Sequence, residues 1–141
     1  IIKKWCSNKL ALDRFDPGEL IKTIKKYKMY VGTNYMLGFP DETRKEVEET
    51  VKFAKKMQGY GLDHSNFYLV MPVPGTPMFD YCIKNKHLPL DYNPDRFQWT
   101  KANLKNTEIG SKELEAIRDY AWETCNKKEF KDLRKSWIVD S

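Results

Sequence analysis

The hydrophobic positions near the start of the chain recur with a helical period. Asp16-Pro17-Gly18-Glu19 is typical of a helix start, because an aspartate accepts free N–H groups of the first turn and proline suits the first helical position. Four apolar or aromatic residues follow at helical spacing: Leu20, Ile21, Ile24 and Tyr27. This spacing predicts a helix of about 12 residues.

Two runs of β-forming residues lie further along the chain. Residues 30–37 end at the breakers Gly38-Phe39-Pro40-Asp41, and residues 64–71 end at Pro72-Val73-Pro74-Gly75. Each run is short, rich in β-forming residues, and closed by glycine and proline, which is the pattern of a strand followed by a turn.

A second helical pattern separates the two runs. Thr43-Arg44-Lys45-Glu46 matches a capping box, and apolar residues follow at spacings typical of one helix face: Val47, Val51, Ala54 and Met57. Gly59 and Gly61 end this pattern. We predict a third helix from Pro77 to about Lys86.

The resulting order is helix, strand, helix, strand, helix, which is typical of βα units and a parallel sheet. Parallel strands occur almost only in sheets of several strands covered on both faces, and this chain supplies two. The strands are therefore expected to pair with another polypeptide, or to be the last part of a larger βα sheet or barrel. We predict an α/β fold with two parallel strands and covering helices.

Beyond Leu88 the pattern changes. Residues 88–106 contain two prolines and no clear period, so we expect an irregular segment. Ser111 is expected to cap a long helix that has Leu114, Ile117, Ala121 and Cys125 on one face and runs on through Phe130, Leu133 and Trp137. We accordingly divide the chain into βα units over 1–87 and an irregular segment plus a helical extension over 88–141.

Composition limits the cellular location and the kinds of metal site that we expect. The chain has 141 residues, 40% of them hydrophobic, with a net charge of +5, and no apolar run long enough for a membrane span or secretory signal. We expect a cytoplasmic location. Cys6, Cys82 and Cys125 are too far apart for a local metal site and are expected to be free thiols, and His64 and His87 lack partners at ligand spacing.

The segment Gly38-Phe39-Pro40 joins a strand to a capped helix. In parallel α/β proteins such turns often bind ligands, because their main-chain amides and the helix N-terminus are free. A turn chosen only for its geometry is the alternative from composition alone. The turn after the second strand is expected to lie beside it.

Taken together, three segments resemble the C-terminal half of the catalytic barrel of radical SAM enzymes. They are Gly-Phe-Pro-x-Glu-Thr at 38–43, the helix at 46–54, and Pro-x-Pro-Gly-Thr-Pro-x-Phe at 72–79. The likeness covers residues 17–87 well and the tail to about 130 more loosely. It is closest to the branch that often carries a cobalamin-binding domain upstream.

The resemblance implies a fold and a cofactor set. Radical SAM enzymes use a partial (βα)6 barrel, bind a [4Fe-4S] cluster through a C-x3-C-x2-C loop and cleave S-adenosylmethionine. This chain lacks that loop, and its strands would be the fifth and sixth. It would then be a fragment of a radical SAM oxidoreductase or methyltransferase-type enzyme, not catalytic by itself, whose partner is the missing N-terminal half of the barrel.

The resemblance also implies S-adenosylmethionine-binding residues. Strand alternation places Asn34, Met36 and Gly38 on one face. These three stand at positions of the family's fifth-strand pattern G-x-I-x-G-x-x-E, in which Gly38 is identical, Met36 replaces the isoleucine and Asn34 replaces the first glycine. Either Asp41 or Glu42 would be the carboxylate that supports the turn. At the end of the sixth strand the backbone of Val70, Met71 and Pro72 would lie near the adenine.

Two other functions stay open. The lysine-rich helices could make a non-catalytic module that binds RNA or protein, although the lysines alternate with acidic residues and are expected to be solvated surface. The chain could also belong to an unrelated βα enzyme in which Gly38-Phe39-Pro40 binds a phosphate or sugar. The residues leave the substrate open.

Overall fold

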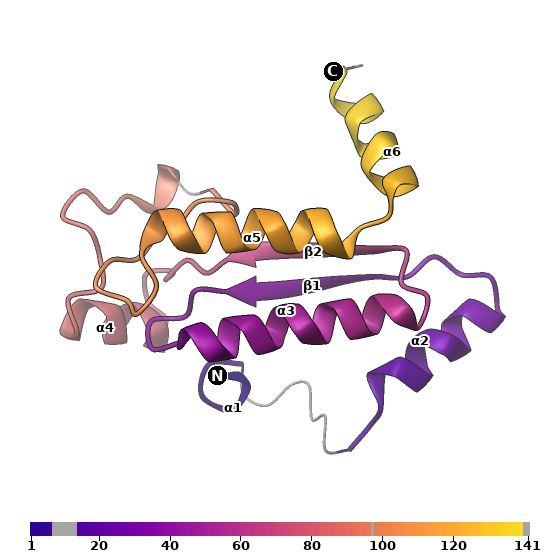
Figure 1. Ribbon diagram of the computed structural model, residues 1–141. Helices are drawn as coiled ribbons and strands as arrows, with labels where there is room; N and C mark the ends of the chain where they lie inside the picture. Colours follow the sequence, from indigo (N-terminus) through magenta and orange to yellow (C-terminus); the bar gives the residue numbers. More distant parts are fainter. Residues whose placement is uncertain (7–13, 97, 140–141) are drawn as a thin grey trace.

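The computed structural model describes residues 1–6, 14–96 and 98–139 (Figure 1). Its elements in chain order are α1 (Ile2–Trp5), α2 (Pro17–Lys26), β1 (Gly32–Leu37), α3 (Arg44–Gly59), β2 (His64–Leu69), α4 (Pro77–Lys84), a 3-10 turn (Pro94–Arg96), α5 (Ser111–Cys125) and α6 (Lys128–Val139).

The two strands form one parallel pair, as predicted. They pair in register from Gly32 opposite His64 to Leu37 opposite Leu69, and α3 connects them. The α/β class and the two parallel strands are thereby confirmed.

One face of the sheet is buried under two helices. Tyr35 and Leu37 of β1 and Phe67 and Leu69 of β2 point into this core. They meet apolar residues of α3 and α5, which lie along the same face (Figure 1): Val47, Val51, Ala54, Leu114, Ala121 and Cys125. Although α5 is remote in sequence, it therefore shares a core with the βα units.

Smaller apolar clusters close the two ends of the sheet. At the end where the strands begin, Ile21 of α2 packs against Met57 and Leu62. At the end where the strands finish, Phe39 and Val70 pack against Cys82 of α4 and Leu104 of the irregular segment. The second cluster holds the turns that follow β1 and β2 in place.

The predicted helix starts of α2 and α3 are confirmed. The side chain of Asp16 accepts a hydrogen bond from the Gly18 N–H at 2.8 Å, with Pro17 in the first turn. Thr43 and Glu46 form the complete capping box of α3. Both helices thus begin where the sequence chemistry indicates.

The C-terminal helix differs from the prediction in two respects. Ser111 is the first helical residue, and Gly110, which makes no side-chain cap, precedes it. The helix also does not run on continuously: it ends at Cys125, Asn126 is extended, and α6 starts at Lys128. The interruption frees the Asn126 side chain to bind the main chain of β2, as described below.

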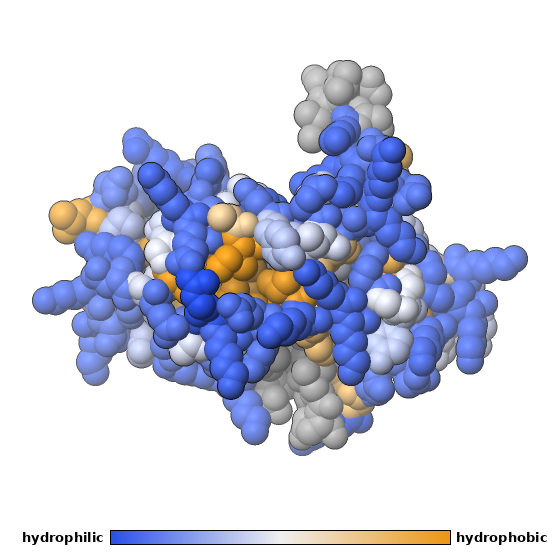
Figure 2. All heavy atoms as spheres, viewed as in Figure 1, coloured by the Kyte–Doolittle hydropathy of each residue, from blue (hydrophilic) through white to orange (hydrophobic). Residues whose placement is uncertain are grey.

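Figure 2 shows that the outer surfaces of the helices are mostly hydrophilic, with apolar side chains gathered between α3 and α5 in the middle of this view. Within the described residues, no helix has both the length and the hydropathy that a bilayer-spanning segment needs.

Candidate functional site

The two outer edges of the sheet differ. At the edge of β2, Asn126 binds both main-chain groups of Ser65, and the Arg118 Nε–H donates to the Phe67 carbonyl at 3.1 Å. The Leu69 N–H donates to the Trp99 carbonyl at 2.8 Å. Residues from the C-terminal part of the chain thus satisfy the edge that would otherwise attract another strand.

Among the residues that the structure describes, none covers the edge of β1 in this way. The carbonyls of Val31 and Leu37 accept bonds from the β2 side, so by strand alternation the main-chain groups of the even-numbered residues Gly32, Asn34 and Met36 point to the opposite edge. In the described part of the chain, β2 is the single strand paired with β1. The unpaired margin of the sheet therefore lies on β1.

The sheet face opposite α3 and α5 is polar and open. Asn34 and Met36 of β1 are exposed on it, next to Asn66 and Tyr68 of β2. The Asn66 Nδ2–H donates to Asn34 Oδ1 at 3.2 Å, and Met36, opposite Tyr68 in the register, leaves 42% of its surface exposed. The predicted sharing of one face by Asn34 and Met36 is confirmed.

The turn after β1 is organised around a buried carboxylate. Glu42 Oε2 accepts hydrogen bonds from the Gly38 N–H at 2.6 Å and the Phe39 N–H at 3.1 Å. The side chain is 4% exposed. Burial raises the pKa of Glu42 to about 7, although these two hydrogen bonds oppose the shift. Of the two carboxylates, Glu42 is the one that supports the turn.

Gly38 has two reasons to be glycine. Its φ is +83°, in the region that L side chains rarely adopt, and a Cβ would lie 2.5 Å from Leu114 Cδ2. The turn and the start of α5 are therefore in close contact.

Asp41 points to a different part of the molecule. Its carboxylate accepts hydrogen bonds from Trp5 Nε1 at 2.8 Å and from the Lys4 ammonium. Although partial burial favours the neutral acid, these partners hold the pKa of Asp41 below its ordinary value. Asp41 thus attaches α1 to the turn.

The segment after β2 lies beside this turn, since the Val70 N–H donates to the Leu37 carbonyl at 3.0 Å. Val70 and Pro72 are buried and Met71 is partly exposed. The Val70 carbonyl accepts from Asn103 Nδ2 at 3.2 Å, and the Pro72 carbonyl accepts from the Tyr92 hydroxyl. Their contact with an adenine stays a prediction.

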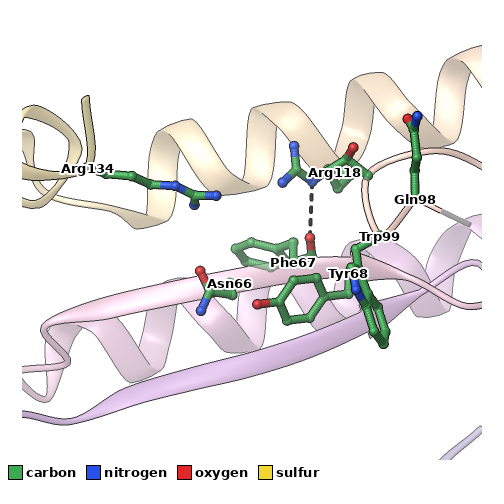
Figure 3. A pocket seen from close by; sticks show the side chains of 8 residues that line it. Asn66, Phe67, Tyr68, Gln98, Trp99, Arg118 and Arg134 are labelled. Atoms are coloured by element: carbon green, nitrogen blue, oxygen red, sulfur yellow. Dashed lines mark hydrogen bonds between the residues drawn. The ribbon is translucent and has the colours of Figure 1, made fainter. Parts of the chain in front are cut away.

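A pocket of about 340 Å³ lies at the outer edge of β2 (Figure 3). Arg118 and Arg134 line its helix side and Asn66, Tyr68 and Trp99 its strand side, with Phe67, Gln98 and Thr100 completing it. The sequence patterns do not identify either arginine or Asn126 as a functional residue. Arg118 is one basic residue among many, and Asn126 lies within what the pattern predicts as one continuous helix, so no local signal marks them.

The three cysteines are free thiols. Cys82 and Cys125 are buried, and burial raises the pKa of the Cys82 thiol to about 11. No group of three or more His, Cys, Asp or Glu that could hold a metal ion occurs among the residues that the structure describes.

Comparison with known proteins gives partial matches. A 70-residue segment, 50% of this chain, is 43% identical to an uncharacterized methyltransferase of Pyrococcus horikoshii. Segments of 68 and 61 residues, 45% and 42% of the chain, are each 34% identical to tRNA-2-methylthio-N(6)-dimethylallyladenosine synthases of Anaplasma phagocytophilum and Acinetobacter baylyi.

These matches cover a small part of each relative. The chain spans 15% of the first two relatives and 12% of the third. No family model and no solved structure matches the chain. The similarities to methyl- and methylthio-transferring enzymes support the resemblance to radical SAM enzymes over about half of the chain.

Proposed function

We propose that this chain is the C-terminal part of the catalytic barrel of a radical SAM enzyme and forms one wall of its S-adenosylmethionine site. The observation that carries the proposal is the sheet itself. One face is buried under α3 and α5, the other exposes amides and a thioether, and the β1 edge is unpaired within the described residues. In a βα barrel the helices likewise lie outside the strands, and the ligand site lies at the carboxyl ends of the strands.

The open face fits S-adenosylmethionine chemically. Asn34 and Asn66 supply amide donors and acceptors for polar groups of the nucleoside or amino acid. Met36 supplies an exposed, polarizable surface for a purine ring. The Glu42-supported turn holds the end of β1 in place beside Val70.

The remaining parts come from outside these residues. When bound, the [4Fe-4S] cluster supplies the electron that cleaves S-adenosylmethionine reductively, and its three cysteine ligands would belong to the N-terminal half of the barrel. The chain alone would then be inactive. The names of the relatives favour methyl or methylthio transfer as the reaction class, and an upstream cobalamin-binding domain stays a prediction.

The first test is reconstitution. The 141-residue chain, treated anaerobically with iron and sulfide, is expected to show no [4Fe-4S] absorption or EPR signal, whereas the longer protein with its upstream residues shows both. A stoichiometric cluster on these 141 residues, or the lack of C-x3-C-x2-C upstream, would contradict the proposal.

The second test addresses the site. In the longer protein, Asn34→Ala and Met36→Ala are expected to weaken S-adenosylmethionine binding about tenfold each, because each removes a direct contact. Lys52→Gln, on the exposed side of α3, is the matched control and should leave binding unchanged. Unaltered binding in both site variants would exclude this face as the site.

The main alternative is a non-catalytic RNA- or protein-binding module. Its hallmark would be salt-sensitive binding through the lysine-rich helix surfaces. The reconstitution experiment separates the two functions, since a binding module gives no cluster in either length of the protein.

A further inference from the structure

We propose that the pocket at the outer edge of β2 binds a phosphate ester of the substrate, with the guanidinium groups of Arg118 and Arg134 as its ligands. The inference rests on the proposed function, because it names a chemical group of that enzyme's substrate. Its test measures binding alone.

The first observation is the way in which Arg118 is held. Its Nε–H donates to the Phe67 carbonyl at 3.1 Å, and one terminal nitrogen donates to Asp119 at 2.6 Å. The side chain is 14% exposed, whereas that of Asp119 is 69% exposed. A guanidinium group has five N–H donors in a fixed plane. The bond to the Phe67 carbonyl thus orients the Arg118 guanidinium group at the pocket. The group has further N–H donors besides those used in these two bonds.

The second observation is the position of Arg134. Phe130, one turn earlier on α6, stacks on His64 of β2 with ring centroids 4.8 Å apart, which attaches the start of α6 to the sheet. Arg134 lies on the same side of the helix, and its guanidinium carbon is 5.3 Å from the centre of the Trp122 ring. Two arginines from different helices therefore converge on one pocket (Figure 3).

The third observation is the charge of the lining. The described residues that line the pocket include these two cations and no carboxylate. Lys101, which follows the lining residue Thr100, forms a salt bridge with Glu115 at 3.0 Å. A guanidinium group presents paired donors that match the oxygens of a phosphate group, and two such groups can bind one phosphate together.

The fourth observation connects the pocket to the proposed active face. Asn66 and Tyr68 line the pocket, and their side chains leave β2 on the open face that holds Asn34 and Met36. The rings of Tyr68 and Trp99 meet edge to face at 5.3 Å and offer apolar surface beside the cations. A substrate anchored by its phosphate at the arginines could extend over Tyr68 toward S-adenosylmethionine.

The test is calorimetric titration of the longer protein without added S-adenosylmethionine. The probes are inorganic phosphate, glycerol 3-phosphate, AMP, adenosine and a single-stranded RNA hexamer with a free 5′-hydroxyl. We expect the phosphate-bearing probes to bind at this pocket and AMP to bind more tightly than adenosine, which lacks the phosphate. Tighter binding of the hexamer than of AMP identifies RNA as the source of the phosphate, and the reverse order identifies a small phosphorylated metabolite.

The variants locate the site. Arg134→Gln is expected to weaken binding of the best phosphate probe by about tenfold or more, because a charge-assisted bond is lost. Arg134→Lys should recover part of the affinity, and Lys52→Gln should match the wild type. Circular dichroism checks that each variant is folded, and Arg118→Lys provides a second measurement at the same pocket.

Three results would overturn the inference: no phosphate probe binds at millimolar concentration, adenosine binds as tightly as AMP, or neither Arg134→Gln nor Arg118→Lys changes the affinity. If phosphate binding fails while the longer protein still cleaves S-adenosylmethionine, this inference alone is wrong. If phosphate binding holds while no cluster forms, the proposed function is wrong.

Discussion

The side-chain amide of Asn126 takes the place of a neighbouring strand for Ser65. Its Oδ1 accepts from the Ser65 N–H and its Nδ2 donates to the Ser65 carbonyl, each at 2.8 Å, and both residues are buried. Nδ2 also donates to the Trp122 carbonyl at 2.8 Å at the end of α5. Because the helix is interrupted between α5 and α6, the Asn126 side chain can bind the main chain at one edge of the sheet.

Asn126→Ala is expected to lower the free energy of unfolding by about 2–4 kcal/mol, because it leaves the buried main-chain groups of Ser65 unpaired. Chemical denaturation measures the change. Asn85→Ala is the matched control: Asn85 also bonds the carbonyl four residues earlier on its helix, but it is exposed, so its loss should cost well under 1 kcal/mol. Equal effects of the two variants would contradict the role given to Asn126.

Gly38→Ala is expected to destabilise the protein by about 3 kcal/mol, from positive φ and from overlap with Leu114. Gly75→Ala isolates the first cause, because Gly75 has φ +82° with open space around it; about 1–2 kcal/mol is expected there. In the Gly38→Ala background, Leu114→Ala should cost less than it does alone. Additive effects of the two substitutions on the free energy of unfolding would show that the added methyl group does not clash with Leu114.

The buried carboxyl group of Glu42 should make the stability of the protein depend on pH. Its pKa is raised by burial from 4.5 to about 7 in the folded protein, so the folded state holds the proton more tightly than the unfolded state. The contribution of Glu42 to the free energy of unfolding should therefore fall as pH rises from 4.5 to about 7 and level off above that, whereas the lowered pKa of His64 acts in the opposite direction.

Glu42→Gln is expected to flatten this dependence, since the amide oxygen still accepts from the Gly38 and Phe39 N–H groups without a charge. Glu42→Ala removes the acceptor and should cost about 2 kcal/mol at low pH. Denaturant midpoints between pH 4 and 8 test both variants. A difference between the wild-type and Glu42→Gln curves that rises over this range would show that the carboxylate is stabilised in its charged form.

The edge of β1 predicts an alternating pattern of hydrogen exchange. In the 141-residue chain the amides of Thr33 and Tyr35, which face β2, should exchange slowly, and those of Asn34 and Met36 should exchange fast. In the longer protein all four should be protected, because a further strand pairs with β1. Fast exchange at Asn34 and Met36 in both forms would mean that β1 is a true edge.

Local sequence chemistry determined much of the fold. The caps at Asp16 and Thr43 and the spacing of the apolar residues on α3 depend on neighbours three or four positions away, and these were predicted correctly. The alternation that exposes Asn34 and Met36 follows equally from the two-residue period of a strand. The two-strand count also indicated an incomplete sheet, because a parallel pair has too little surface to bury alone.

Tertiary structure decided what local pattern leaves open. Asp41 and Glu42 are adjacent acids with the same local environment, and their roles separate only when α1 takes Asp41 and the turn buries Glu42. The local pattern places Asn126 in a continuous helix. Its role is apparent only from its contact with Ser65, 61 residues earlier in the chain. Arg118 and Arg134 become a pair through the packing of α5 and α6 on β2, a contact between distant segments that no short-range periodicity encodes.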